Sequence, residues 1–334
     1  MKRTFSAILC LLLIASAFVF VGCDKKDETV KLGLGLHTAT KVANATEDAN
    51  GKAQATMTVA AVTLDAAGKI LACQLDTADY TVAYTADGKA VANDSFKTKY
   101  EMGKDYNLVA YGNAAKEWFE QADAFEGVVA GKTIDEVKAL VVNNYRGNDA
   151  VIAAGCTIGI NDLVLAVEKA VANAKAEVAA DAKLRIGVAG QQAVTEASAE
   201  KNAGNKLTAN IFIAAVDAAG KVLASSTDCV EYAFSLKDGK VEIDNKDGLS
   251  KRNKGDGYNM VAYGKGSALD GGDVKNEWYV QANAFDAACV GKTGAEIAGL
   301  MLTEGQHAGR GIDSLQAAGC TIYVSGFVAA AAKI

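Results

Sequence analysis

The sequence predicts an α+β fold made of two tandem homologous domains, each a mainly antiparallel sheet with packed helices. Three observations predict it. Strand-like segments precede helix-like segments in each half, the halves share long stretches of sequence, and 334 residues are too many for one ordinary core. Strands followed by helices in blocks are typical of α+β domains. We expect one repeat over residues 30–175 and a second over residues 183–334.

The first part of each repeat predicts a hairpin and a further strand. Residues 58–76 match residues 210–228, each with an apolar segment, an Asp-Ala-Ala-Gly turn and a second apolar segment. Further strands are expected at 80–84 and 232–235, with Asp-Gly turns at 87–88 and 238–239. Gly33 and Gly35 lack the third glycine of a dinucleotide-binding fingerprint, so they indicate a loop or an edge strand.

The second part of each repeat predicts helices. Residues 116–133 match 276–293, and Trp118, Ala122 and Phe125 recur at helical spacing, so one face is buried. Gly-Lys-Thr then ends this helix and caps another over 134–141. After a strand at AAGCTI, we expect a final helix from residue 163 to about 175, and a counterpart beginning at 325–326. Residues 175–183 are a linker or extend that helix, and residues 267–273 add a Gly-rich loop.

The N-terminus predicts export and a lipid anchor. Lys2 and Arg3 precede an apolar run over residues 7–21, followed by Gly22 and Cys23 and then an abruptly polar segment. This is typical of a lipoprotein signal peptide over residues 1–23. Cys23 would become an acylated N-terminus, lipid-anchored on the extracytoplasmic side of a bacterial membrane or on the cell surface. An ordinary cleaved signal with a chance cysteine is the alternative.

Several function classes are not supported by the sequence. A net charge of -6 without a basic stripe argues against nucleic acid as a partner. Gly-Lys-Thr at 131–133 and 291–293 lacks the earlier glycine of a phosphate-binding P-loop. His37 and His307, the two histidines, do not occupy matching positions, and the chain has no CxxC motif. We therefore expect no metal site, no haem attached through a CxxCH motif, no iron-sulfur cluster and no His-based catalytic triad.

One repeated segment points to chemistry beyond packing. RGNDAVIAAGCTI at 146–158 returns as RGIDSLQAAGCTI at 310–322. A threonine hydroxyl can form a phosphoester, and small neighbours leave it open to close approach. The pattern is similar to an export-side flavinylation motif of an acid, a spacer and small residues before threonine, although the spacer is two residues longer and Cys replaces Ala. The residues that match between the copies are Asp149 and Asp313, Gly155 and Gly319, Cys156 and Cys320, and Thr157 and Thr321.

The cysteines allow two interpretations. Besides Cys23, the mature chain has an odd number, so at least one is free: Cys73, Cys156, Cys229, Cys289 and Cys320. They could fill buried core positions, as free cysteines often do. Alternatively, Cys156 and Cys320 could be redox partners of whatever the adjacent threonines carry.

A wider pattern resembles the PplA-like family, flavinylated (FMN-binding) lipoproteins of extracellular electron transfer. The resemblance spans nearly all of the mature chain. In the second copy it lies on Tyr258, Met260, Glu277, Trp278, Gln281, Ala282, Ala284, Phe285, Val290, Gly291, Lys292, Thr293, Thr321 and Ile322. In the first copy it lies on Tyr106, Glu117, Trp118, Gln121, Ala122, Ala124, Phe125, Gly131, Lys132, Thr133, Thr157 and Ile158, with Leu108 in place of the methionine.

The resemblance implies covalent FMN on Thr157 and Thr321, two per chain, installed by an FMN transferase of the ApbE type. Trp118 and Trp278 would wall the flavin ring, with tyrosines lining it, or these aromatic residues would simply pack in the core. Two arginines would contact the flavin phosphate or lie on the surface. The tyrosines are Tyr106, Tyr111, Tyr258 and Tyr263, and the arginines are Arg146 and Arg310.

The implied protein is an electron carrier rather than an enzyme with its own substrate. It would accept electrons from a membrane quinone-linked donor and pass them to an extracellular acceptor such as ferric iron. It would touch the membrane only through its lipid anchor. Two alternatives remain: a surface binding or adhesion lipoprotein without a redox role, and a flavin-dependent reductase of a specific substrate, which would need a defined pocket beside the ring.

Overall fold

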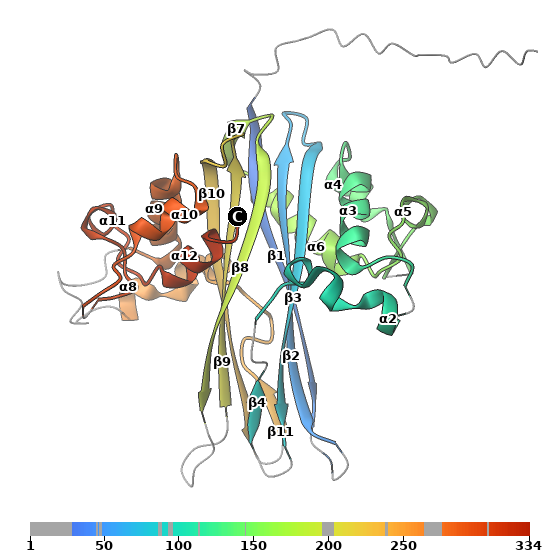
Figure 1. The fold of residues 1–334 in the computed structure, drawn as a ribbon, viewed down its shortest axis with the longest axis horizontal. Helices are drawn as coiled ribbons and strands as arrows, with labels where there is room; N and C mark the ends of the chain where they lie inside the picture. Colours follow the sequence, from blue (N-terminus) through green and yellow to red (C-terminus); the bar gives the residue numbers. More distant parts are fainter. Residues whose placement is uncertain are drawn as a thin grey trace, which may run out of the picture.

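The computed structural model describes residues 29–334 except 45, 47–48, 86–88, 93–95, 113, 144, 196–203, 238–239, 264–275 and 306. The expected signal peptide with Cys23, both Asp-Gly turns and the Gly-rich loop at 267–273 lie outside the described residues. The described residues form an α+β fold with two antiparallel sheets and packed helices, as expected (Figure 1).

Each half contributes one sheet. The N-terminal sheet has the strand order β4-β3-β2-β1-β7 and the C-terminal sheet the order β11-β10-β9-β8. The N-terminal strands are β1 (Thr29–Ala43), β2 (Gly51–Leu64), β3 (Ile70–Tyr84), β4 (Ala90–Ala92) and β7 (Ala176–Ala179). The C-terminal strands are β8 (Lys183–Thr195), β9 (Gly204–Val216), β10 (Val222–Lys237) and β11 (Lys240–Ile243).

The expected hairpins are confirmed, but three details of the strands were wrong. The separate strand expected at 80–84 is the end of β3, because β3 pairs with β2 without interruption as far as Tyr84. Likewise, residues 232–235 belong to β10. Residues 176–179 of the expected linker form β7, which pairs with residues 29–32 of β1. Gly33 and Gly35 lie inside β1 beyond its pairing with β7, where β1 pairs with β2 alone, so the edge-strand alternative is confirmed and the loop is not.

The helices occur in the same order in both halves. The N-terminal half has α1 (Lys99–Met102), η2 (Gly103–Tyr106), α2 (Leu108–Gly112), α3 (Trp118–Val129), α4 (Ile134–Lys138), α5 (Asp149–Ala154) and α6 (Asn161–Ala172), with a small ladder of β5 (Val141–Val142) and β6 (Arg146–Gly147). The C-terminal half has α7 (Lys251–Lys254), η3 (Gly255–Tyr258), α8 (Met260–Tyr263), α9 (Trp278–Cys289), α10 (Gly294–Ile297), η4 (Ala298–Leu300), α11 (Asp313–Ala317) and α12 (Ser325–Ala331). No helix among the described residues is long and apolar enough to cross a membrane.

The AAGCTI segments are not strands, contrary to expectation. Their alanines end α5 and α11, and the glycines that follow adopt left-handed backbone conformations, with φ of +102° at Gly155 and +96° at Gly319. A left-handed glycine ends a helix and turns the chain. The following residues make only single bridges, such as Arg146 with Gly159. The repeated string is therefore a helix end and a turn.

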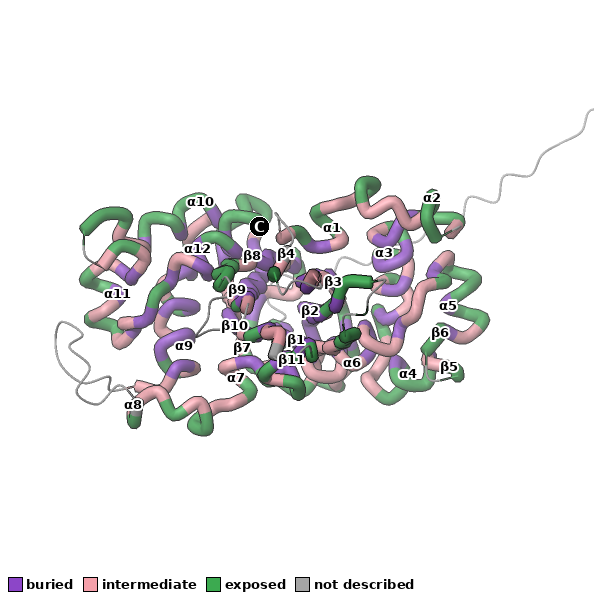
Figure 2. Tube along the Cα trace, turned by 90° about the horizontal axis from the view of Figure 1, so that it is seen from below, coloured by how far each residue is buried: buried purple, intermediate pink, exposed green. Residues whose placement is uncertain are grey.

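The sheets and helices make four layers (Figures 1 and 2). The two sheets face one another across a central core that takes side chains from both halves, such as Met57, Tyr80 and Ile211. The other face of each sheet is covered by the helices of its own half, with Phe125 and Phe285 in the two outer cores. The C-terminal parts of β2 and β9 are buried on both faces, and their residues are mostly apolar there.

Candidate functional site

The turn after α5 and α11 separates a buried cysteine from an exposed threonine. Cys156 and Cys320 are fully buried in the two outer cores. Burial raises the pKa of Cys156 to about 11 and that of Cys320 to about 12, so both stay protonated thiols at neutral pH. Thr157 is exposed and Thr321 is partly exposed. This placement agrees with the core interpretation of these cysteines, and all five cysteines of the described residues are free.

A buried glutamine holds each threonine. The Oε1 atom of Gln121 accepts hydrogen bonds from the Thr157 amide at 2.7 Å, the Thr157 hydroxyl at 2.9 Å and the Ile158 amide at 3.1 Å. The Oε1 atom of Gln281 accepts from the Thr321 amide at 2.8 Å and the Thr321 hydroxyl at 3.0 Å. Because each hydroxyl donates its proton to glutamine, the remaining lone pairs of Oγ1 are free to face outward.

The Nε2 atom of each glutamine is fixed as well. It donates to the backbone carbonyl of Lys116 at 2.8 Å in the N-terminal half and of Asn276 at 2.9 Å in the C-terminal half. Both glutamine side chains are 1% exposed. A buried amide with all its partners in place has one orientation, so the threonine position is set by the helix that carries the glutamine.

The other members of the Glu-Trp-x-x-Gln motif join this turn to a neighbouring segment. Glu117 accepts the Leu108 amide at 2.8 Å, and Glu277 accepts the Met260 amide at 2.8 Å, at the starts of α2 and α8. A carboxylate satisfies helix amides that have no partner within the helix. Within each half, the Glu-Trp-x-x-Gln motif is therefore held against the helix that precedes it in the sequence.

A lysine lies over the tryptophan and a tyrosine in both halves. Lys251 Nζ is 5.1 Å from the ring centroid of Tyr258 and 5.8 Å from that of Trp278. Lys99 Nζ is 5.1 Å from Tyr106 and 5.7 Å from Trp118. These are cation–π distances.

Acidic partners hold both lysines. Lys99 lies 3.1 Å from Asp79, and Lys251 lies 3.3 Å from Glu231. Burial alone would lower the pKa of both lysines. Asp79 raises the pKa of Lys99 above its usual value, and Cys229 and Glu231 do the same for Lys251. Each lysine therefore stays protonated beside its acidic partner.

A cavity of about 370 Å³ opens beside Thr321. Two of its donors have no partner: Nε of Arg310, which is 7% exposed, and Nδ2 of Asn210, which is 5% exposed. Buried donors without acceptors are costly, by about 1–3 kcal/mol each, so they mark a place where acceptor atoms of a ligand would be stabilised. The lining includes Thr321, Trp278, Tyr258, Lys251, Arg310 and Asn210.

The two sites differ at their arginines. Arg310 is buried, with its guanidinium carbon 5.2 Å from the Tyr323 ring centroid, whereas Arg146 is exposed. The residue at the place of Tyr323 in the N-terminal half is Gly159, which cannot cover an arginine. Arg146 thus lies on the surface, as one alternative expected for both arginines. Arg310 is buried, which leaves the alternative of a contact with a ligand phosphate open for it alone.

The remaining predicted residues are spread more widely. Asp149 and Asp313 lie exposed in the first turns of α5 and α11. Tyr111 is 88% exposed on α2, so the structure does not bring it into a cavity, and the side chain of Tyr263 lies outside the described residues. Trp118 packs in the outer core, as the packing alternative has it, and Trp278 does so while also lining the cavity.

The sequence interpretation missed three participants. Lys99 and Lys251 occupy matching places in the two copies, which was a signal that could have found them. The glutamines were noticed as part of a motif without a role. Asn210 had no signal, because Thr58 occupies its place in the other half. Among the described residues, no cluster of three or more histidine, cysteine or acidic side chains could hold a metal ion.

The fold and sites define a class: a four-layer α+β protein with a glutamine-anchored threonine at one helix end in each half. Comparisons with protein-family models, with curated proteins and with solved structures gave no match. The resemblance to flavinylated lipoproteins therefore stays a prediction.

Proposed function

We propose that this protein is an extracytoplasmic electron-transfer lipoprotein that carries covalent FMN on Thr157 and Thr321. The observation that carries the proposal is the threonine hydroxyl at the surface, fixed by a buried glutamine and accompanied by a lysine over tryptophan and tyrosine, present in both halves. Packing alone does not require this arrangement twice. The proposal includes descent of the halves from one duplicated FMN-carrying repeat.

The C-terminal site fits a flavin nucleotide. The phosphate oxygens and ring carbonyls of FMN are acceptors, and the unpartnered donors of Arg310 and Asn210 need acceptors. Trp278 and Tyr258 supply aromatic walls, and Lys251 adds a positive charge. The hydroxyl of Thr321 borders the same cavity, where a phosphoester would begin.

The attachment chemistry needs an external transferase of the ApbE type. The transferase would join the threonine Oγ1 to the flavin-side phosphorus of FAD and break the P–O–P bridge, with AMP as the leaving group and the hydroxyl proton passing to a base of the transferase or to AMP. Gln281 and Gln121 prepare this step, because their Oε1 atoms hold the hydroxyl proton and leave a lone pair facing outward. After attachment, each glutamine keeps its hydrogen bond from the threonine amide.

The flavin, when bound, supplies one- or two-electron redox chemistry. The chain itself binds, orients and shields, and it needs no catalytic acid or base for electron transfer. The donor would be a membrane quinone-linked route and the acceptor an extracellular oxidant such as ferric iron. Lipidation of Cys23 would hold the protein at the membrane, and covalent attachment would prevent loss of the cofactor outside the cell.

Exported protein purified from a host with the transferase tests the proposal. It should be yellow and heavier, by two FMN groups each less one water, than the same exported protein from a host without the transferase. Thr157→Ala and Thr321→Ala should each remove one flavin, and the double variant both. Colourless protein of unmodified mass would exclude a flavoprotein, whereas flavin found on other residues would overturn the site assignment only.

A further inference from the structure

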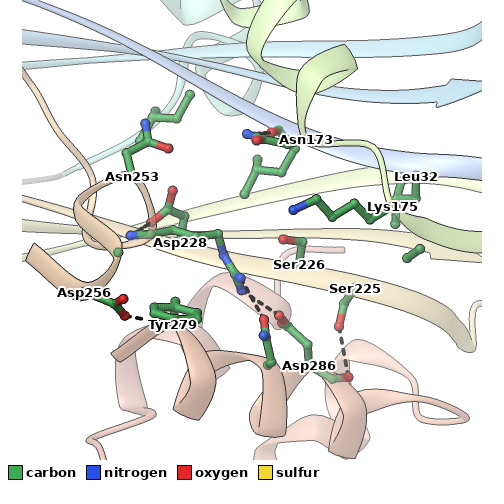
Figure 3. Close-up of a pocket in the computed structure, with 16 residues that line it drawn as sticks. Leu32, Asn173, Lys175, Ser225, Ser226, Asp228, Asn253, Asp256, Tyr279 and Asp286 are labelled. Atoms are coloured by element: carbon green, nitrogen blue, oxygen red, sulfur yellow. Dashed lines mark hydrogen bonds and ion pairs between the residues drawn. The ribbon is translucent and has the colours of Figure 1, made fainter. Parts of the chain in front are cut away.

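A second and larger cavity lies between the two halves of the protein. Its volume is about 710 Å³, within the range of small-molecule sites (Figure 3). One side is β1 of the N-terminal half, and the other is formed by β10, α9 and the segment of α7 and η3. Neither Thr157 nor Thr321 lines it, so it is separate from the proposed flavin sites.

One wall of this inter-half cavity is apolar and the opposite wall is polar. The apolar wall carries Leu32, Leu34 and Leu36 of β1. On the polar wall, Arg252 is fixed by three acceptors: the Thr227 carbonyl at 2.8 Å, Asn283 Oδ1 at 2.7 Å and Asp286 Oδ2 at 3.0 Å. A polar wall held by such a network is preorganised for one ligand orientation.

Most carboxylate oxygens of the polar wall are already engaged. The Oδ2 atom of Asp286 pairs with Arg252, whereas its Oδ1 atom is buried and has no partner. Asp228 accepts the amides of Cys229 at 2.7 Å and Arg252 at 3.1 Å, and Asp256 accepts the Tyr279 hydroxyl at 3.1 Å in the neighbouring helices. Their capacity to recognise a cationic ligand is reduced accordingly.

Two donors remain free. The ammonium of Lys175 and the hydroxyl of Ser226 point into the cavity (Figure 3). Among the described residues, neither this ammonium group nor this hydroxyl has a hydrogen-bond partner. Arg252 uses three of its five N–H donors in the network above, which leaves two more. Lys175, Ser226 and Arg252 thus offer free donors, which suit an anionic or acceptor head, while the unpartnered acceptor Oδ1 of Asp286 is buried away from the open space.

The corresponding place on the other side of the molecule is much smaller. Ser226 pairs with Ile213 of β9, as Gln74 pairs with Ala61 of β2, and Gln74 lines a cavity of about 210 Å³. Tyr100 stands there at the sequence place of Arg252. Lys333 also reaches across that cavity to Glu101 at 2.6 Å. Only one of the two matched places has kept room for a ligand.

We propose that the inter-half cavity binds a small amphipathic acid, with its apolar body against the β1 leucines and its carboxylate-like head at Lys175, Ser226 and Arg252. This site does not depend on the flavin. It gives the protein a small-molecule ligand besides its proposed cofactor.

Fluorescence titration of the purified mature chain with 8-anilinonaphthalene-1-sulfonate tests this site. We expect one probe per chain, with equal affinity in flavinylated and unmodified protein. In competition, 1-naphthoate should displace the probe at a lower concentration than 1-naphthylmethylammonium, which has a similar body and the opposite charge. Lys175→Glu should weaken naphthoate about fivefold, because it reverses an exposed charge at the site.

A cavity-filling pair of variants locates the binding. Ser226→Phe should weaken the probe at least about tenfold, since the new ring occupies the space of the ligand. Gln74→Phe, at the matched place, should leave affinity unchanged, and both variants should keep the circular dichroism spectrum of the parent. No binding, unchanged binding in Ser226→Phe, equal loss in both variants or preference for the ammonium competitor would overturn the proposal. Failure here leaves the flavin proposal intact, because that proposal is tested by mass.

Discussion

At the residue scale, one glutamine oxygen organises each threonine turn. Oε1 of Gln121 takes three donors and Oε1 of Gln281 takes two, all from residues that follow the left-handed glycine. The side-chain amide of a helix residue thus accepts the backbone N–H groups that a neighbouring strand would otherwise bind. The conformation of each threonine turn therefore depends on this glutamine.

Replacing Gln281 should show how much its hydrogen bonds to Thr321 contribute to stability and to flavinylation. Gln281→Leu leaves the Thr321 amide without its acceptor, so we expect the free energy of unfolding to fall by about 1–3 kcal/mol. In flavinylated preparations, mass spectrometry should show reduced modification of Thr321 while Thr157 is modified as before. The matched control is Gln192→Leu on the exposed part of β8, which should change stability by less than about 0.5 kcal/mol. Equal stability of Gln281→Leu and parent would contradict the role.

Repetition in the sequence could predict the threonines, glycines and buried cysteines, because each position has the same local surroundings in both copies. It could not predict the difference between Arg146 and Arg310. Both precede glycine, yet Arg310 is covered by Tyr323 from a residue thirteen positions away, where the other half has Gly159. Burial of an arginine depends on such neighbours, which a motif does not contain.

At the scale of elements, α6 crosses β1 unusually closely. A Cβ atom built on Gly33 would collide with the carbonyl oxygen of Ala170, and one on Gly35 with that of Ala166, both on α6. In the C-terminal half, Gly187 meets Ala330 in the same way. These glycines therefore serve helix-on-sheet packing, which the sequence alone did not distinguish from a loop.

Alanine at Gly35 should show this packing. Gly35→Ala forces α6 away from β1, so we expect a loss of about 1–3 kcal/mol in unfolding free energy. Gly127→Ala is the control, because Gly127 lies exposed in α3 with nothing near its Cβ position, and it should stabilise the protein by about 0.5–1 kcal/mol. Urea denaturation followed by circular dichroism gives both values. The same sign for both variants would refute the close-packing argument.

The contact between α3 and β3 should make stability depend on pH. Burial raises the pKa of Glu126 to about 8, although the Leu75 amide donates to its Oε1 atom at 2.7 Å and lowers it. The folded protein therefore keeps a proton that the unfolded chain releases above about pH 4.5. Stability contributed by this group is present at low pH and lost as pH rises toward 8.

Glu126→Gln removes this titration and keeps the oxygen that accepts the Leu75 amide. We expect its unfolding free energy to fall less than that of the parent between pH 5 and pH 8, with a difference of about 1–2 kcal/mol at pH 8. Urea midpoints at several pH values measure it. A parent protein whose stability rises over this range would show that the carboxylate is ionised in the folded state.

At the scale of the whole molecule, the two sheets share a central core. The sequence could predict that β2 and β9 contain strands of hairpins, but it did not predict that their C-terminal parts are buried on both faces. It could not predict that the second face would be the other half of the chain. The two sheets meet through the side chains of this core and through the hydroxyl of Tyr80, which donates to Asn205 at 2.7 Å.

A shared core predicts one cooperative unfolding transition. The chain has two tryptophans, Trp118 in the N-terminal half and Trp278 in the C-terminal half. Trp278→Phe and Trp118→Phe thus leave one fluorescent reporter in each half. In each variant, the urea midpoint by fluorescence should coincide with that by circular dichroism, because neither half keeps its fold without the facing sheet.

Adding Ile211→Ala to each reporter variant opens the central core from the C-terminal side. Ile211 is fully buried there, so unfolding free energy should fall by about 2–5 kcal/mol. The loss should be equal at both reporters, although Trp118 belongs to the other half. A urea midpoint that drops only in the variant that keeps Trp278 would mean that the halves unfold as independent domains. The central core would then be an interface between two separately folded domains rather than the core of a single folding unit.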